Sequence, residues 1–206
     1  MSRRSEPPRG PGRDAGSARS GAAVSQPLGA GRAMPGHKAV DGQLSTEAIT
    51  VRRATLSDLP VIVELRLALL RENANHPVYG RLRADAGERA YSVFGAQLRS
   101  PPEVIFFAET GDEVVGILRC VETFNSPLLH PDRYCYVSSV YVRPRLRRLG
   151  VLRALLRRAE GWCAERNLTE MRLHNVPGGG AGAAWNAAGF AVVEEVRLKA
   201  LGALRS

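Results

Sequence analysis

The sequence predicts a mixed α/β fold, in which a central, mostly antiparallel sheet is covered by helices on both faces. Segments that alternate apolar and polar residues recur between segments of helical periodicity, in the order β, α, α, β, β, β, α, β, α, β. One strand-helix-strand crossover stands out, centred on VYVRPRLRRLGVLRALL from Val140 to Leu156. Such a crossover requires one parallel pair of strands, so the sheet is predicted to be mixed.

The expected elements are bounded by recognisable start and stop signals. The first helix has Ser57 or Asp58 as its N-cap and Pro60 in its first turn, and the second helix ends before Pro101 and Pro102. In chain order, we expect a strand at 49–54, helices at 55–73 and 86–100, strands at 103–110, 114–124 and 133–142, a helix at 151–166, a strand at 170–176, a short helix and turn at 182–190, and a last strand at 191–201.

The first 46 residues are predicted to form a disordered basic tail, and residues 47–206 a single folded domain. Gly, Pro, Ser, Arg and Ala dominate the tail, which contains hardly an aliphatic residue. Such a segment cannot bury enough apolar surface to offset a backbone entropy cost of about 1–2 kcal/mol per residue. Met34 is an alternative to Met1 as the translation start.

The composition indicates the cellular compartment and limits the classes of partner. The formal net charge of +9 is compatible with nucleic acid, an anionic surface or a small polyanion such as a nucleotide cofactor. The three cysteines are far apart among apolar neighbours, which favours buried thiols in a reducing cytoplasm, and no metal site is expected. No segment reaches the roughly 18 apolar residues of a membrane span, and no zinc, helix-turn-helix or RNP-like motif supports nucleic-acid binding.

The junction between the strand at 133–142 and the helix at 151–166 is a candidate anion site. A helix start has four backbone N–H groups without intrahelical partners and carries the positive end of the helix dipole. Gly150 lets an anion approach the backbone, and Arg147 and Arg148 add forked donors. On this stretch alone, phosphate binding and ordinary solvent-facing arginines are equally compatible with the pattern, and neither GxGxxG nor a Walker A loop is present.

The order of elements and two motifs together resemble the GCN5-related N-acetyltransferase (GNAT) family. That family has a strand ending in V-x-P, then (Q/R)xxGx(G/A), then a Leu-rich helix, and later an aromatic residue four positions before Gly-Phe. The matching residues here are Val142, Pro144, Arg147, Gly150, Leu155 and Leu156, followed by Trp185, Gly189 and Phe190. The resemblance covers roughly residues 49–201.

The resemblance implies that acetyl-coenzyme A is the co-substrate and binds in a wedge between two splayed parallel strands. Two positions depart from the family pattern: Leu152 stands where Gly or Ala is usual, and Trp185 stands where a tyrosine often acts as general acid. The implied coenzyme-binding residues are Val140, Tyr141 and Val142, whose backbone would bind the pantetheine arm, and Arg147, Arg148, Leu149, Gly150, Val151 and Leu152, which would hold the pyrophosphate.

Acetyl transfer by direct attack through a tetrahedral intermediate also requires a base, because a lysine-like amine has a pKa of about 10.4 in water. Glu122 and His174 are the candidate bases, and a backbone N–H near Tyr141 or Val142 is the candidate oxyanion donor. Ser138 and Ser139 could order a water molecule or satisfy core hydrogen bonds. The connection at 72–85 offers Glu72, His76 and Tyr79 as contacts for the acceptor.

Three functions are therefore compatible with the sequence. The first is an N-acetyltransferase that acts on a primary amine of a small molecule or a protein, with a homodimer as a possible assembly. The second is a GNAT-like protein that binds acyl-coenzyme A without catalysis, which Leu152 and Trp185 would explain. A basic nucleic-acid-binding module is the third, and only the net charge favours it.

Overall fold

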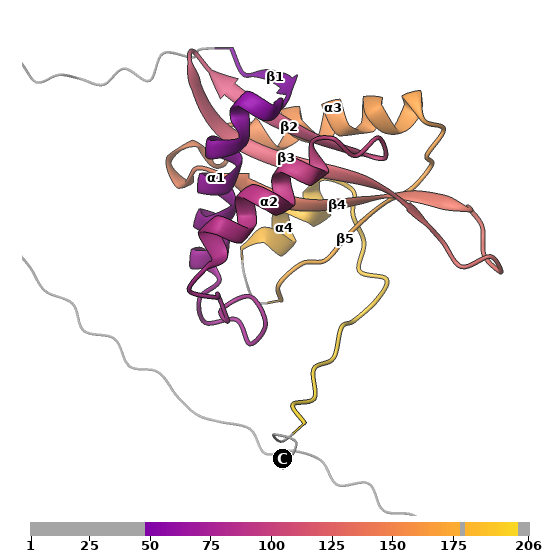
Figure 1. Ribbon diagram of the computed structural model, residues 1–206. Coiled ribbons are helices and arrows are strands. Elements are labelled where there is room, and N and C mark those ends of the chain that lie inside the picture. Colours follow the sequence, from indigo (N-terminus) through magenta and orange to yellow (C-terminus); the bar gives the residue numbers. More distant parts are fainter. Residues whose placement is uncertain (1–47, 178–179, 202–206) are drawn as a thin grey trace, which may run out of the picture. The chain divides into compact units, whose positions relative to one another are not determined.

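The computed structural model describes residues 48–177 and 180–201 (Figure 1). The predicted tail at 1–46 and the alternative start at Met34 lie outside the described residues. The helices are α1 (Leu59–Glu72), α2 (Ala86–Gln97), α3 (Val151–Glu165) and α4 (Ala181–Ala187), with short 3-10 turns at Leu56–Asp58 and Pro144–Leu146. The strands are β1 (Thr50–Arg53), β2 (Glu103–Thr110), β3 (Glu113–Phe124), β4 (Arg133–Val142) and β5 (Met171–Leu173).

The five strands form one mixed sheet in the order β1-β2-β3-β4-β5. The first three pairings are antiparallel, and β5 lies parallel to β4 after the crossover through α3. The predicted fold class is therefore confirmed, including the parallel pair at the crossover. None of the helices between residues 48 and 201 that the structure describes is long and apolar enough to cross a membrane.

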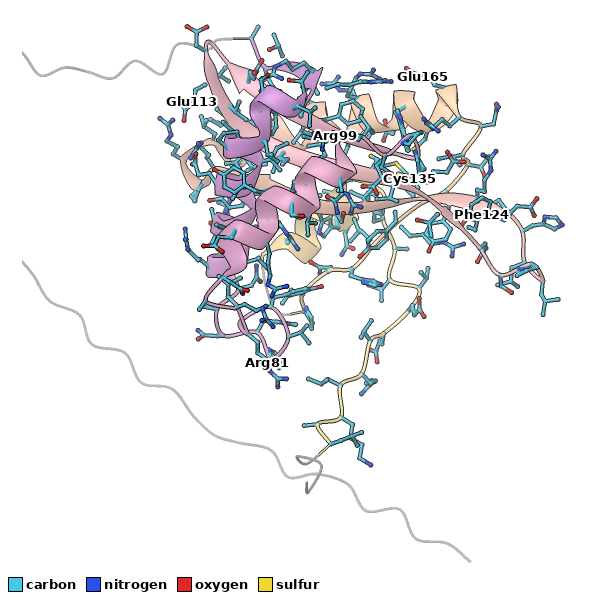
Figure 2. All side chains as sticks on the ribbon, in the orientation of Figure 1. Arg81, Arg99, Glu113, Phe124, Cys135 and Glu165 are labelled. Carbon is cyan, nitrogen blue, oxygen red and sulfur yellow. The ribbon has the colours of Figure 1, made fainter. Side chains whose placement is uncertain are left out.

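Helices cover both faces of the sheet, with α1 and α2 over one face and α3 over the other (Figure 1). Alternation along the strands divides the apolar side chains between two cores, because successive residues point to opposite faces. On β2, Ile105 and Phe107 pack towards α1 and α2, whereas Phe106 and Ala108 pack towards α3. Figure 2 shows the β3–β4 hairpin extending beyond the helices to Phe124, which is 78% exposed.

A bulge in β4 reverses this alternation. Arg119 pairs with Ser138 and Ile117 with Tyr141, so the single residue Leu118 of β3 stands opposite two residues of β4. One of these two, Ser139, has a φ of 53°, in the left-handed region that a bulge uses. As a result, Val137 packs in the α3 core before the bulge, whereas Tyr141 packs in the α1–α2 core after it.

Gly116 on β3 allows α3 to pack closely against the sheet. A Cβ at this position would lie 2.9 Å from Cγ1 of Val151 and 3.2 Å from Cδ1 of Leu155. Both side chains are fully or almost fully buried in the first turns of α3. The absence of a side chain at Gly116 therefore sets how near the N-terminus of α3 lies to the ends of β3 and β4.

Hydrogen bonds and an ion pair stabilise the start of α1, and the sequence predicted only the N-cap residue among them. Asp58 is the N-cap of α1, as predicted, but a 3-10 turn precedes the helix, which begins at Leu59. The Asp58 carboxylate accepts the backbone N–H of Thr55 at 2.7 Å and pairs with Arg52 at 2.7 Å. The guanidinium of Arg52 is the main reason that the pKa of Asp58 falls to about 2.

The predicted last strand at 191–201 is wrong, because these residues form no strand in the structure. The strand predicted at 170–176 is shorter than expected, since only Met171–Leu173 pair with β4. The segment at 191–201 alternates apolar and polar residues, but a strand also needs a neighbouring strand that forms hydrogen bonds with its backbone groups. Without one, its apolar side chains stay exposed, as Val192 (84%) and Val193 (86%) illustrate.

Replacing Gly116 by Ala is expected to lower the free energy of unfolding by about 1–3 kcal/mol, because the new methyl group would overpack the contact with Val151 and Leu155. Urea unfolding followed by circular dichroism measures this loss. Gly87→Ala, in α2, is the matched control, because a Cβ there meets nothing within 4 Å and alanine favours the helix. If Gly116→Ala proved as stable as Gly87→Ala, the close approach of α3 would not depend on this glycine.

Candidate functional site

The start of α3 presents a row of backbone donors without partners. The N–H groups of residues 148–152 donate to no other described residue. Arg148 has a φ of 65° and Gly150, the N-cap of α3, a φ of 89°, so two left-handed residues lie in the turn just before the helix. A run of unpaired N–H groups at the positive end of a 15-residue helix is suited to bind an anion.

Arg147 anchors this loop. Its Nε donates to the carbonyl of Val142 at 2.9 Å, and its Nη2 lies 2.8 and 2.7 Å from the two carboxylate oxygens of Glu72. The guanidinium also lies over the ring of Tyr141, 5.6 Å from the centroid. Arg147 therefore links the end of β4, the end of α1 and the start of the loop at residues 148–150.

The edge of β4 next to this loop is open. β5 pairs only with Cys135, Tyr136 and Val137, so the residues of β4 from Ser138 onward have no strand beside them on that side within 48–177 and 180–201. Val140 and Val142 pack against the α3 core, and Tyr141 is buried against α1. The structure thus brings the predicted pantetheine-binding residues next to the predicted pyrophosphate-binding residues.

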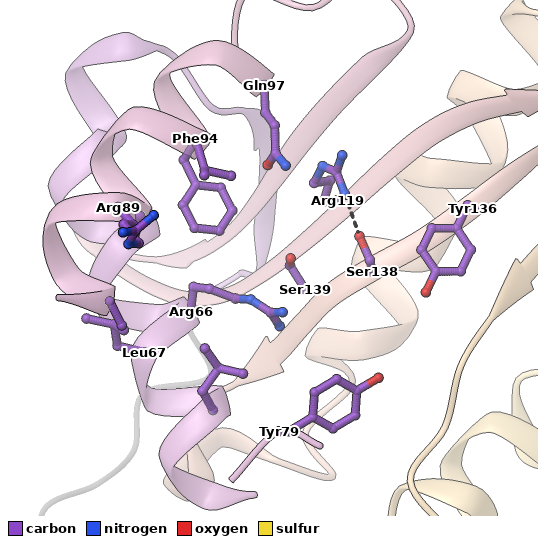
Figure 3. A pocket seen from close by; sticks show the side chains of 14 residues that line it. Arg66, Leu67, Tyr79, Arg89, Phe94, Gln97, Arg119, Tyr136, Ser138 and Ser139 are labelled. Carbon is purple, nitrogen blue, oxygen red and sulfur yellow. Dashed lines mark hydrogen bonds between the residues drawn. The ribbon is translucent and has the colours of Figure 1, made fainter. Parts of the chain in front are cut away.

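A pocket of about 390 Å³ lies on the other side of the β4 bulge, between the sheet and the first two helices (Figure 3). Its outer wall comes from α1 and α2, and its inner end comes from β3 and the bulge. The lining residues on the helices and their connection are Arg66, Leu67, Leu70, Tyr79, Ala86, Arg89, Ala90, Val93, Phe94 and Gln97, and those on the strands are Arg119, Tyr136, Ser138 and Ser139.

The pocket is positively charged, because three arginines line it and no acidic residue does so. Two of these arginines have carboxylate partners: Arg119 binds Glu103 at 2.6 and 2.8 Å, and Arg89 binds Asp85 at 2.6 Å. Arg119 also donates to the hydroxyl of Ser138 at 3.0 Å, as Figure 3 shows.

The third arginine, Arg66, makes no hydrogen bond or ion pair with any residue that the structure describes, although it is half-buried. Burial is the main reason that its pKa is lowered, and the nearby charge of Arg119 adds to this effect. Close by, the carbonyl Oε1 of Gln97 is a buried atom without a hydrogen-bond partner. Each helix of the pocket therefore carries a polar group without a hydrogen-bond partner among the described residues: the guanidinium of Arg66 on α1 and Oε1 of Gln97 on α2.

His174, one of the two candidate bases, reaches this pocket through Tyr136. Its Nδ1 lies 3.2 Å from the hydroxyl of Tyr136, which lines the pocket, and the two rings meet edge to face at 5.4 Å. Burial raises the pKa of Tyr136, which keeps the phenol neutral and able to donate. The imidazole itself is exposed to solvent.

Glu122, the other candidate base, lies on the opposite face of the sheet. It stands opposite Cys135, which points into the α3 core, and its side chain is only 10% exposed. Its carboxylate binds Arg133 and Arg166, the latter at 2.7 Å. These contacts fix the end of β3 to the residue after α3, and they occupy both carboxylate oxygens.

The three residues predicted to contact the acceptor, Glu72, His76 and Tyr79, have different surroundings in the structure. Tyr79 lines the pocket. The Nδ1 of His76 accepts the backbone N–H groups of Val78 and Tyr79 at 3.2 and 3.1 Å, and its ring stacks on Tyr79 at 4.7 Å, so it orders the turn. Glu72 forms an ion pair with Arg147.

The two departures from the family pattern both have structural explanations. Leu152 packs against the α3 core, so its side chain leaves the donors at the helix start uncovered. Trp185 also packs against that core, edge to face with Phe190 at 5.5 Å. The N–H of Phe190 donates to the carbonyl of Trp185, and that of Gly189, with a φ of 88°, to the carbonyl of Asn186. The aromatic-to-Gly-Phe motif is thus a Schellman cap that ends α4.

A family model described as the acetyltransferase (GNAT) family matches residues 67–190, which is more than half of the 206-residue chain. The chain belongs to the GNAT acetyltransferase family. This match runs from α1, through the bulge and the loop at residues 148–150, to the cap of α4. No curated protein matches the sequence.

Solved structures of GNAT proteins share the fold. A predicted acetyltransferase with acetyl-CoA from Clostridium acetobutylicum superposes with a TM-score of 0.62 at 20% identity, over 74% of this chain and 96% of that one. A GCN5-related N-acetyltransferase from Ralstonia eutropha gives 0.62 at 22% identity, over 74% and 99%. An aminoglycoside antibiotic 6'-N-acetyltransferase from Acinetobacter haemolyticus gives 0.59 at 19% identity, over 74% and 97%.

The sequence prediction missed the residues that give the GNAT pocket its charge. Arg66 and Arg119 each stand in an apolar segment, and a polar residue in such a segment was the available signal. Tyr136 was missed because its strand was read as core. Among the described residues, no group of three or more His, Cys, Asp or Glu side chains is arranged to hold a metal ion.

Replacing Glu122 by Gln is expected to lower the free energy of unfolding by about 1.5–3 kcal/mol, because Arg133 and Arg166 lose a largely buried charged acceptor. Glu165→Gln is the matched control, since Glu165 also binds two arginines, Arg53 and Arg158, but is 53% exposed. Its loss should stay below about 1 kcal/mol. Equal losses in urea unfolding of the two variants would contradict the structural role of Glu122.

Proposed function

We propose that this GNAT protein is an N-acetyltransferase that transfers the acetyl group of acetyl-coenzyme A to a primary amine of a small molecule or a protein. One observation supports this most strongly. The open edge of β4 runs directly into the unpaired N–H groups of residues 148–152, and a pocket opens on the other side of the same strand at its bulge. The open edge and the N–H groups suit a coenzyme, and the pocket suits an acceptor amine. The two molecules would then meet at β4.

The coenzyme-binding residues each have a part in this proposal. The N–H groups of Arg148, Leu149, Gly150, Val151 and Leu152 would receive the pyrophosphate, with Arg147 holding their loop in place. At the open edge of β4, the backbone of Val140, Tyr141 and Val142 would pair with the amides of the pantetheine arm, as an added strand does. The carbonyl of Val142 already accepts the Nε of Arg147. A backbone N–H near Tyr141 would stabilise the oxyanion.

In the reaction, the acceptor nitrogen would form a bond with the acetyl carbon to give a tetrahedral oxyanion. This intermediate would collapse as the carbon–sulfur bond breaks, and the nitrogen would lose its second proton to solvent or to the base. The amine must first lose a proton, and coenzyme A leaves as the thiolate. Of the two candidate bases, His174 is favoured, because its contact with Tyr136 connects the pocket with solvent. Glu122 faces the other core and is occupied by two arginines, which favours a structural role.

A protein that binds acyl-coenzyme A without catalysis is the alternative. The packing of Trp185 in the α3 core supports it, because the indole cannot replace a tyrosine as general acid. A screen of an amine library for released coenzyme A thiol separates the two functions. Release above the rate of acetyl-coenzyme A hydrolysis supports the enzyme, whereas tight binding without release from any amine supports the alternative.

Location and assembly stay predictions. The cytoplasmic location is inferred from composition, and the homodimer is a possible assembly. The exposed apolar side chains at 191–201 would be partly covered in a dimer. Light scattering of the purified chain at micromolar concentration measures its mass against the 22.3 kDa of one copy.

Replacing Gly150 by Ala is expected to weaken acetyl-coenzyme A binding about tenfold or more, because a φ of 89° is strained for alanine and the donors at the helix start would shift. Isothermal titration calorimetry measures the affinity. Gly161→Ala is the control, since Gly161 lies within the same helix with space for a Cβ. Unchanged affinity in Gly150→Ala would show that the coenzyme does not use this loop.

Replacing His174 by Gln is expected to lower kcat by about 10²-fold or more if the imidazole receives the proton of the amine. The drop should shrink as the pH rises, because more of the amine is then already neutral. His130→Gln is the control, since His130 is 97% exposed on the β3–β4 hairpin. A rate equal to that of the control at every pH would rule out His174 as the base.

A further inference from the structure

The charge of the pocket at the β4 bulge restricts the acceptor. We infer that the acceptor amine carries a carboxylate, which binds Arg66, together with an apolar group, which packs against α1 and α2. This inference rests on the proposed N-acetyltransferase function and adds the chemical class of its acceptor. It differs from the class of acceptor named for the Acinetobacter haemolyticus enzyme, because an aminoglycoside carries several positive charges.

Arg66 is the residue that carries the inference. Its guanidinium is always charged near neutral pH, and burying such a charge is costly unless it is paired. Arg66 is half-buried and has no acidic partner among residues 48–177 and 180–201, whereas Arg119 and Arg89 in the same pocket each have one. A ligand carboxylate would supply the missing partner through two parallel hydrogen bonds.

The position of Arg66 also fits the reaction. Figure 3 shows its side chain reaching from α1 towards Ser139, at the bulge that separates the pocket from the open edge of β4. A carboxylate bound there would hold the amine of the same small molecule near the end of the pocket where the acetyl group is expected. A single free guanidinium matches one carboxylate, whereas a phosphate dianion would leave charge unpaired.

The rest of the lining defines the other part of the acceptor. Leu67, Leu70, Ala90, Val93 and Phe94 form an apolar wall along α1 and α2. A volume of about 390 Å³ lies near the lower end of the range of about 300–1,000 Å³ for small-ligand pockets. These properties suit an amine the size of an amino acid with an apolar side chain.

Matched amines test the inference. The panel contains L-phenylalanine and L-leucine, the amide of each, the corresponding amines without the carboxyl group, O-phosphoethanolamine, and the aminoglycoside kanamycin. Thiol release should give a kcat/KM for the amino acids at least about tenfold above those of their amides and decarboxylated forms. Binding is read separately, as the thermal stabilisation of the protein by each amine in the presence of coenzyme A.

Arg66 variants identify the group responsible. Arg66→Gln should raise KM for the amino acids about tenfold or more, leave acetyl-coenzyme A affinity unchanged and abolish the preference for acid over amide. Arg66→Lys should restore part of the preference. Arg71→Gln is the control, because Arg71 is exposed on the same helix and does not line the pocket.

Three results would overturn the inference: a preference for neutral amines, for kanamycin or for the phosphate; a preference for acids that survives in Arg66→Gln; or neither binding nor turnover of any carboxylated amine. The proposed function fails in a different way, through the absence of thiol release with every amine, whether or not acetyl-coenzyme A binds. The two failures are therefore distinguishable in one set of measurements.

Discussion

Two residues of β4, Ser139 and Val140, stand opposite the single residue Leu118 of β3, and the site depends on this bulge. The bulge turns Tyr141 from the α3 face to the α1–α2 face, and the pairing with β5 ends two residues before it, at Val137. The strand thus leaves its parallel neighbour just before it enters the loop at the start of α3. An open strand edge and a row of free helix N–H groups then follow one another along a single segment of chain.

Packing and ion pairs have different parts in holding the two sides of the site together. α1 forms a wall of the pocket, and Glu64 and Glu72 on this helix bind Arg143 at 3.0 Å and Arg147 at 2.7 Å in the junction that follows β4. Because these pairs are partly exposed, each contributes about 1 kcal/mol or less. The larger contribution comes from burial of Val151 and Leu155 of α3 against the sheet at Gly116. The packing therefore positions the junction between β4 and α3, and the ion pairs orient it.

Local signals predicted much of the fold and half of the site. Helical periodicity, the proline at the start of α1 and the glycine before α3 are signals that each lie within a few residues, so the helices, the hairpin and the position of the turn at Gly150 were predicted correctly. The bulge was not, because RYCYVSSVYV has the composition of a regular strand and only its register with β3 reveals the extra residue. Non-local pairing also explains the other misses: Glu122 meets Arg166 from beyond α3, and the segment at 191–201 lacks a partner strand.

The proposed function requires that the junction of β4 and α3 binds coenzyme A through backbone N–H groups. Titration of the 15N-labelled protein with coenzyme A, followed by NMR of the backbone amides, tests it most directly. The largest shifts are expected at residues 148–152, with smaller shifts at residues 140–142. Binding that shifts amides elsewhere and leaves residues 148–152 unchanged, or no binding at millimolar coenzyme A, would contradict it.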